Sequence, residues 1–294
     1  MKPPVFEYRA PETVGEAIAA LASDEDAVVL AGGQSLLPAM NFRLARPSLL
    51  VDIQHVAGLK GISIEGGQIV VKAMTRHREL ELDERVGEAN PLIAEALAHV
   101  AHIPIRNRGT VVGSLCHADT AAELPMVLVL LGGSVVAQGT AGRREIAADD
   151  FFQFHLTTTR QRDEIVVEAR FPVLPSDAGF AFDEFTRRHG DYAIAGVGST
   201  LRLAADGTLR DIRLAACGIA ARPVRLLAAE KRLLNSRMDG ADLAAAGDAA
   251  ATAVTAPDDM HATTAYRRRV VATLTRRMVA KAAARARERM KAKG

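Results

Sequence analysis

The pattern of hydrophobic and polar positions predicts a small α/β unit at the start of the chain. Apolar and polar side chains alternate over residues 6–8, as in a strand, and residues 13–16 carry the capping-box pattern that begins a helix. Short apolar runs at 27–30 and 49–53 predict two buried strands. We therefore expect residues 1–55 to form an N-terminal α/β subdomain.

The pattern over residues 56–175 predicts a second α/β subdomain. A Glu-Gly-Gly turn between two β-branched runs at 61–72 predicts a hairpin, and residues 134–146 predict another. The apolar run at 121–131 stops at two glycines, as a buried helix does, and a strand at 164–171 stops at a proline. The proline opens a short linker to the rest of the chain.

The remaining residues, 176–294, group their strands before their helices. Strand-like runs at 180–188, 194–203 and 209–219 are followed by three helical segments. This order is typical of an α+β domain rather than of alternating βαβ units. The pattern predicts a C-terminal α+β domain with a three-stranded antiparallel sheet, and α+β is the fold class that we expect for the chain.

Composition limits the chemistry that the chain can perform alone. Apolar residues make up 49% and charged residues 24% of the 294 positions, the balance of a globular protein. Cys116 and Cys217 are the only cysteines, too few for a disulfide framework or an iron–sulfur cluster. His99 and His102 lack a nearby third ligand, so we expect no metal site. The sequence has no signal-peptide pattern and no apolar run long enough to span a membrane, which predicts a cytoplasmic protein.

Charge is distributed unevenly along the chain. Residues 266–294 hold 11 Lys and Arg against one Glu, although the formal net charge of the whole chain is only +2. Tyr266 is the only aromatic residue of this basic segment, so we expect no nucleic-acid binding, which would need several aromatic side chains to stack on bases. Two interpretations stay open: a solvated helix, or a surface for an acidic partner subunit.

Two loops rich in glycine and small residues are the main candidates for chemistry. The first, Ala31-Gly-Gly-Gln-Ser35, directly follows a predicted buried strand, and its glycines allow the backbone to approach an anion. The second, Arg108-Gly-Thr-Val-Val-Gly-Ser114, lies within a predicted loop at 104–119 and adds two hydroxyl groups. Neither fits the dinucleotide or P-loop pattern. Together they predict a clasp around one diphosphate that needs neither a metal nor a lysine.

Two strings of the sequence carry a specific family resemblance. AGGQSLLPAMNFRLARPSLLVDI (31–53) and IRNRGTVVGSLCHADTAAELP (105–125) closely resemble the FAD-binding medium subunit of the molybdenum hydroxylases, the family of carbon monoxide dehydrogenase and xanthine dehydrogenase. Residues 185–198, with Gly190-Asp-Tyr-Ala193, are similar to the start of the C-terminal flavoprotein domain of that family. The resemblance runs along the whole chain.

The resemblance implies an FAD-binding fold of the vanillyl-alcohol oxidase type, with FAD between two α/β subdomains and a C-terminal α+β domain over the flavin. Glu123 is implied to accept a ribose hydroxyl, and Tyr192 to lie against the isoalloxazine ring. No residue is implied to be catalytic, because the flavin supplies the redox chemistry. The residues implied to bind FAD are Ala31, Gly32, Gly33, Gln34, Ser35, Leu36, Gly109, Thr110, Gly113, Ser114, His117, Asp119, Glu123 and Tyr192.

Three of the positions near the second loop call for separate interpretation. Val112 stands where the family usually has a glycine, and a β-branched residue disfavours positive φ. We therefore expect ordinary extended backbone or a reshaped loop at Val112, and exclude it from the FAD contacts. His117 and Asp119 have an alternative role as turn or cap residues.

The function implied is that of an FAD-containing electron-transfer subunit in a multi-subunit molybdenum hydroxylase. A large partner subunit is expected to carry molybdopterin and a small partner subunit the iron–sulfur clusters, in a dimer of heterotrimers, with electrons leaving through FAD to an external acceptor. One alternative is a self-sufficient FAD-dependent oxidoreductase of the same fold. Another is a scaffolding module that has lost its cofactor.

Overall fold

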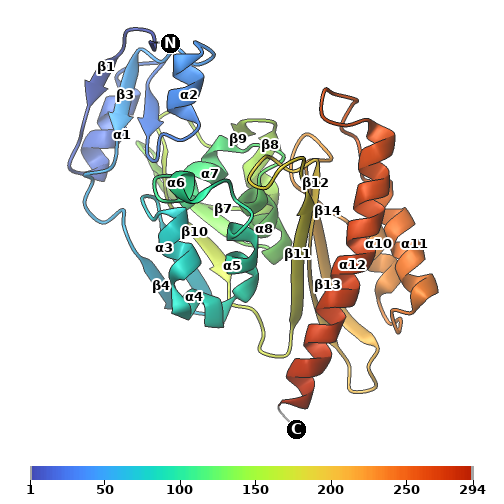
Figure 1. Cartoon of the computed structure of the whole chain (residues 1–294). Helices are drawn as coiled ribbons and strands as arrows, with labels where there is room; N and C mark the ends of the chain where they lie inside the picture. The colour runs from blue at the N-terminus through green and yellow to red at the C-terminus, as the bar shows by residue number, and fades with distance from the viewer. Residues whose placement is uncertain (1, 293–294) are drawn as a thin grey trace.

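The computed structural model describes residues 2–292, in which three main sheets follow one another along the chain (Figure 1). The first sheet is parallel, with strand order β1-β3-β2, and lies at the N-terminal end of the molecule. Thr13 and Glu16 form the predicted capping box at the start of its first helix. The elements of this part are β1 (Glu7–Arg9), α1 (Val14–Ala22), β2 (Val28–Leu30), α2 (Leu36–Asn41) and β3 (Leu49–Asp52).

The second sheet has five strands in the order β4-β5-β10-β6-β7, and all of its pairings are antiparallel. Both predicted hairpins are present, as β4-β5 and β6-β7, and β10 joins them by pairing antiparallel with β5 and β6. Its strands are β4 (Ile62–Glu65), β5 (Gln68–Lys72), β6 (Ser134–Gly139), β7 (Gly142–Ala147) and β10 (Ile165–Pro172). A separate small hairpin comprises β8 (Phe152–Phe154) and β9 (Thr157–Thr158).

The helices of this second part lie between β5 and β8 in the sequence. They are α3 (His77–Leu82), α4 (Glu84–Ala89), α5 (Pro91–Leu97), α6 (Ile103–Arg106), α7 (Val111–His117), α8 (Glu123–Leu131) and α9 (Ala148–Phe151). Every residue of α8 is buried, because the helix lies between the second sheet and the C-terminal sheet. Gly132 ends it in the left-handed conformation, with a φ of +68°, as the sequence predicts.

The third sheet has four strands, in the order β11-β12-β13-β14, where three were expected. The additional strand, β14, is two residues long, too short to leave a hydrophobic pattern. The strands are β11 (Gly179–Phe185), β12 (Ala195–Leu203), β13 (Leu209–Cys217) and β14 (Val224–Arg225). Three helices follow, as predicted: α10 (Leu227–Leu233), α11 (Gly240–Ala251) and α12 (Thr264–Lys291).

Helix α12 is neither a solvated tail nor wholly a partner surface. It packs along β11 and β12, and its buried side chains include Val271, Leu274 and Met278. A Cβ on Gly179 of β11 would lie 1.9 Å from the carbonyl oxygen of Ala282, so strand and helix touch through their backbones. The basic side chains occupy the remaining positions of a helix that is part of the core.

No helix within residues 2–292 is both long and apolar enough to cross a membrane.

Candidate functional site

The two glycine-containing loops lie in direct backbone contact. A Cβ on Gly32 would lie 2.6 Å from the carbonyl oxygen of Arg108, 2.7 Å from Cα of Gly109 and 2.9 Å from the nitrogen of Thr110. Any side chain at Gly32 would therefore push the two loops apart. The fold brings together two segments that are far apart in the sequence, as the clasp hypothesis predicts.

The first loop presents consecutive N–H groups. Gly33 has a φ of +71°, and α2 begins directly after Ser35. Among the hydrogen bonds of residues 2–292, none is donated by the backbone N–H groups from Gly32 to Ser35, whereas the side chain of Gln34 donates to the carbonyl of Gly32 at 3.1 Å. A set of backbone donors without protein acceptors is suited to an anion.

The second loop is shorter than the sequence indicates, because α7 begins at Val111. Thr110 caps this helix, and its Oγ1 accepts a hydrogen bond from the nitrogen of Gly113 at 3.1 Å. Val112 lies in the first turn, so the expectation of extended backbone at this position is wrong. Helical φ is negative, and a valine adopts it without the strain that a left-handed conformation would impose.

A histidine that the sequence did not single out supports the second loop. The backbone nitrogen of His77 donates to the carbonyl of Gly109 at 3.0 Å, and its ring lies against Gly109, 3.0 Å from where a Cβ would stand. Burial lowers the pKa of His77 to about 4, so its ring is neutral at physiological pH. Its only sequence signal is its position at the start of a helix.

His117 and Asp119 lie where α7 ends. Ala118 between them has a φ of +52°, and Asp119 Oδ1 accepts a hydrogen bond from the nitrogen of Ala121 at 2.9 Å. This is the turn role given above as the alternative for Asp119. Burial lowers the pKa of His117, although the carboxylate of Asp119 acts in the opposite direction.

Glu123 and Tyr192 approach this region from two further elements. Glu123 is the first residue of α8 and is 5% exposed; burial, followed by the nearby Glu184, raises the pKa of its carboxyl group to about 8. Tyr192 lies on the connection between β11 and β12, and its phenol is near the side chain of Ser35. Although 56% of Tyr192 is exposed, desolvation of its phenol and then the carboxylates of Asp119 and Glu123 raise its pKa above the usual range. Residues from all three parts of the chain therefore converge.

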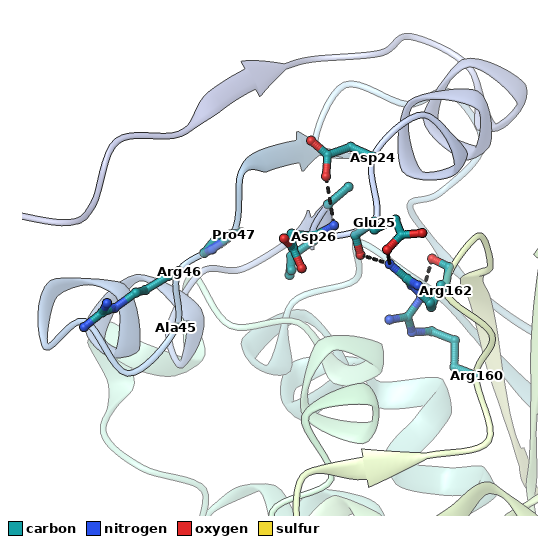
Figure 2. A pocket seen from close by; sticks show the side chains of 10 residues that line it. Asp24, Glu25, Asp26, Ala45, Arg46, Pro47, Arg160 and Arg162 are labelled. Carbon is teal, nitrogen blue, oxygen red and sulfur yellow. Dashed lines mark hydrogen bonds and ion pairs between the residues drawn. The ribbon is translucent and has the colours of Figure 1, made fainter.

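A separate cavity of about 360 Å³ lies where the N-terminal part faces the loop after β9 (Figure 2). Figure 2 shows Asp24, Glu25 and Asp26 on the N-terminal side and Arg160 and Arg162 on the other side, with Arg162 bonded to Glu25. None of the residues expected to bind FAD lines this cavity. Its lining comprises Asp24, Glu25, Asp26, Ala27, Val28, Ala45, Arg46, Pro47, Arg160 and Arg162.

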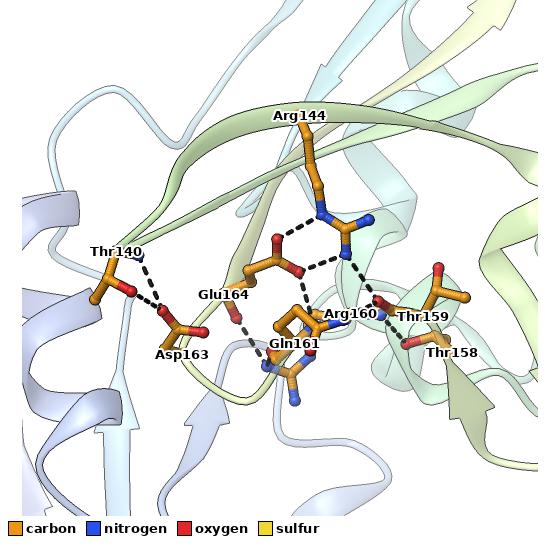
Figure 3. Close-up of polar contacts among 8 residues, drawn as sticks. All are labelled: Thr140, Arg144, Thr158, Thr159, Arg160, Gln161, Asp163 and Glu164. Carbon is orange, nitrogen blue, oxygen red and sulfur yellow. Dashed lines mark hydrogen bonds and ion pairs between the residues drawn. The ribbon is translucent and has the colours of Figure 1, made fainter.

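The loop that carries Arg160 and Arg162 is held by a polar network (Figure 3). Glu164 accepts hydrogen bonds from Arg144 Nε at 2.6 Å and from the nitrogen of Gln161 at 2.6 Å. Arg160 in turn donates to the carbonyl of Glu164 at 2.8 Å. These bonds fix the backbone of one wall of the cavity.

Two sequence families match successive regions of the chain. Residues 4–174 match the family described as the FAD binding domain in molybdopterin dehydrogenase, and residues 180–282 match the CO dehydrogenase flavoprotein C-terminal domain. The chain therefore belongs to the molybdopterin dehydrogenase FAD-binding family.

Relatives align with this molybdopterin dehydrogenase family member along nearly its whole length. The 6-hydroxypseudooxynicotine dehydrogenase complex subunit alpha of Paenarthrobacter nicotinovorans is 42% identical over 98% of this chain and 97% of its own. The nicotine 6-hydroxylase medium subunit of the same organism is 38% identical, covering 97% of this chain and all of the relative. A chain of carbon monoxide dehydrogenase from Hydrogenophaga pseudoflava superposes with a TM-score of 0.94 at 36% identity, covering 97% and 99% of the two chains.

Proposed function

We infer that this chain is the FAD-binding electron-transfer subunit of a multi-subunit molybdenum hydroxylase. The observation that carries the inference is the backbone contact at Gly32 between two loops, one of which has N–H groups that donate to no protein acceptor. The relatives named above are named for different substrates, which supports a step that their complexes share rather than one that recognises the substrate.

FAD fits the cradle that these loops form. Glycine at position 32 lets the two loops approach each other through their backbones, and N–H groups with no protein acceptor supply hydrogen bonds to a diphosphate without adding a cation. Tyr192, whose phenol lies near Ser35, marks the side of the cradle on which we place the flavin ring. We propose the same contacts as the resemblance implies: Ala31, Gly32, Gly33, Gln34, Ser35, Leu36, Gly109, Thr110, Gly113, Ser114, His117, Asp119, Glu123 and Tyr192.

When bound, FAD supplies the capacity to take up and release electrons. The chain's own residues bind and orient it: the loops hold the diphosphate, and neutral His77 supports Gly109 without placing a charge beneath it. Tyr192 covers part of the ring, and burial raises the pKa of Glu123, which favours a protonated carboxyl group that donates as well as accepts a hydrogen bond.

Partner subunits must supply the other redox centres, because two cysteines cannot ligate iron–sulfur clusters. Burial also raises the pKa of Cys116 to about 11, which keeps its thiol protonated. We propose a large molybdopterin subunit and a small iron–sulfur subunit, assembled as a dimer of heterotrimers in the cytoplasm. The vanillyl-alcohol oxidase type of fold, divided at residues 1–55, 56–175 and 176–294, belongs to the same proposal.

Cofactor analysis and co-purification test this function. The full chain should be yellow and release FAD rather than FMN on denaturation, and the native complex should contain molybdenum, iron and FAD in one fraction. The isolated subunit should accept electrons from a chemical donor but not from the organic substrate. Substrate turnover by the isolated subunit would instead support the self-sufficient oxidoreductase, and a chain that takes up no flavin would support the scaffolding alternative.

A further inference from the structure

The loop at 186–193, between β11 and β12, carries Tyr192 but has little backbone support from other segments. The nitrogen of Asp191 donates to the carbonyl of Arg188 at 3.0 Å, and the side chain of Arg188 donates to that of Asp191 at 3.2 Å. Both bonds lie inside the loop. Within residues 2–292, no backbone hydrogen bond joins the loop to a distant segment. Side-chain contacts must therefore fix where Tyr192 lies.

His102, on the connection between α5 and α6, packs against this loop. A Cβ on Gly190 would lie 2.5 Å from Cε1 and 2.8 Å from Nδ1 of His102, so the imidazole ring lies directly against the backbone of Gly190. The ring of His189 stacks beside that of His102, with 6.3 Å between the centroids and 24° between the planes. Two neighbouring residues of the loop therefore contact one histidine ring.

The turn that carries His102 is held by a buried arginine. Arg106 is 6% exposed, and its Nη1 donates to the carbonyl of Val100 at 2.9 Å and to that of Ala101 at 3.0 Å. Its Nε donates to the carboxylate of Glu81 at 2.9 Å. The backbone directly before His102 is therefore fixed, which makes the histidine a firm support for the loop.

The same turn leads into the second glycine-containing loop. Helix α6 begins directly after His102, and the carbonyl of Ile105 in this helix accepts a hydrogen bond of 2.7 Å from the nitrogen of Gly109. His102 is thus joined to the loop that we propose holds the diphosphate. The side chain of His102 is exposed, so its removal leaves no cavity in the core.

We propose that His102 is a positioning residue for Tyr192. Its ring holds the loop at Gly190 and so determines where Tyr192 lies over the flavin, relative to the bound diphosphate. His102 acts through the tyrosine rather than on the flavin itself. The effect on the flavin rests on the proposed function, whereas the contact of His102 with the loop does not.

Flavin reoxidation in the full chain with bound FAD tests this role. After reduction with dithionite, H102A should react with oxygen at a rate changed several-fold, in the same direction as in Y192A, because the tyrosine is no longer held in place. The dissociation constant of FAD should stay within about threefold of wild type, since both glycine-containing loops are unaltered. H102F keeps a planar ring against Gly190 and should restore the wild-type rate. H102A/Y192A should react at the rate of Y192A, because His102 acts through the tyrosine.

Gly207 provides the matched control for Gly190. The two glycines have φ values of +81° and +85°, but a Cβ on Gly207 would meet no atom of residues 2–292 within 4 Å. G190A and G207A therefore carry similar backbone strain, and only G190A disturbs the contact with His102. G190A should change the reoxidation rate as H102A does, and G207A should leave it unchanged. Equal effects of the two variants would overturn the proposal, because strain alone would then account for them.

An unchanged reoxidation rate in a folded, FAD-containing H102A chain would also overturn the proposal, as would effects of H102A and Y192A that add. Hydrogen exchange, followed by mass spectrometry without flavin, tests the contact independently of the proposed function. The amides of residues 186–193 should exchange several-fold faster in H102A than in wild type or H102F, and equal exchange would overturn the contact. A wild-type chain that takes up no FAD but shows this difference would contradict the proposed function and leave His102 as the residue that holds the loop.

Discussion

The two contacts that assemble the candidate site differ in kind. Loops 31–35 and 108–114 meet through backbone atoms at Gly32, where no side chain can intervene. The C-terminal part meets the rest of the chain through side chains: apolar α8 is buried against β12 and β13, and Glu95 of α5 accepts hydrogen bonds of 2.6 Å from Lys281 and from Arg285 of α12. The first contact fixes the position of the two loops relative to each other. The second holds the C-terminal part, which carries Tyr192, against the loops. Substitutions should therefore affect cofactor affinity at one contact and stability at the other.

The largest effect on cofactor binding is expected at Gly32. In G32A the new methyl group would overlap three backbone atoms of the other loop, so the loops must separate. Overpacking of this kind costs about 3 kcal/mol, which corresponds to about 100-fold weaker FAD binding. The dissociation constant of FAD, followed by flavin fluorescence, measures the loss.

Gly33 provides the matched comparison. Its Cβ would meet side chains rather than backbone, Leu37 at 3.0 Å and Leu30 at 3.3 Å. The main cost of G33A is therefore the left-handed φ, about 1–2 kcal/mol of folding stability. FAD binding should weaken less than in G32A. Equal affinities in the two variants would show that the backbone contact at Gly32 does not shape the cradle.

The largest effect on folding stability is expected at Arg267, on α12 of the C-terminal part. This arginine is 5% exposed and donates to the carbonyls of Ile194 and Gly218 and to Asp259. R267A leaves buried acceptors unpaired and should lower the free energy of unfolding by about 3 kcal/mol. The neighbouring exposed Arg268 is the control, and R268A should stay within about 0.5 kcal/mol of wild type in the same denaturant titration. Equal losses would contradict the role of the buried guanidinium.

Features set by local sequence are predicted well, whereas contacts between distant parts of the chain are not. The first loop, the hairpins and the end of α8 at Gly132 follow from local signals, because glycines and β-branched runs restrict the backbone wherever they occur. The start of α7 was missed because Gly109 and Gly113 read as loop, while the helix is stabilised by Thr110 and by burial. The contact of Glu184 with His99 depends on the docking of β11 and has no local signal.

Helix α12 shows how composition can hide a pattern. Its many basic residues suggested a solvated segment, yet Val271, Leu274, Met278 and Ala282 recur at helical spacing and form a buried face. The periodicity was present in the sequence. Average charge conceals it, because long basic side chains occupy the exposed positions of the same turns.

A smaller, pH-dependent effect on the free energy of unfolding is expected at Glu95. Burial opposes ionisation of its carboxyl group, but the contacts with Lys281 and Arg285 outweigh burial and lower its pKa. A lowered pKa stabilises the fold above the unfolded value of about 4.3, and that contribution is lost as the pH falls below it. E95Q should therefore unfold about 1 kcal/mol more easily at pH 7 and approach wild type near pH 3. Thermal unfolding at several pH values checks this, and a difference that persists in acid would assign the loss to packing.

The smallest effect on FAD affinity is expected at Tyr192, which belongs to the C-terminal part rather than to the two loops. Y192F removes only the hydroxyl group and should weaken FAD binding by less than about tenfold, since one hydrogen bond contributes about 1 kcal/mol. Y192A should also retain FAD, because the loops still hold the diphosphate, but it should alter the flavin absorption spectrum and speed or slow reoxidation by exposing the ring. Spectra and rates identical to wild type in Y192A would place Tyr192 away from the flavin. Loss of FAD from Y192A as severe as from G32A would mean that Tyr192, and not the backbone contact of the two loops, supplies most of the binding free energy.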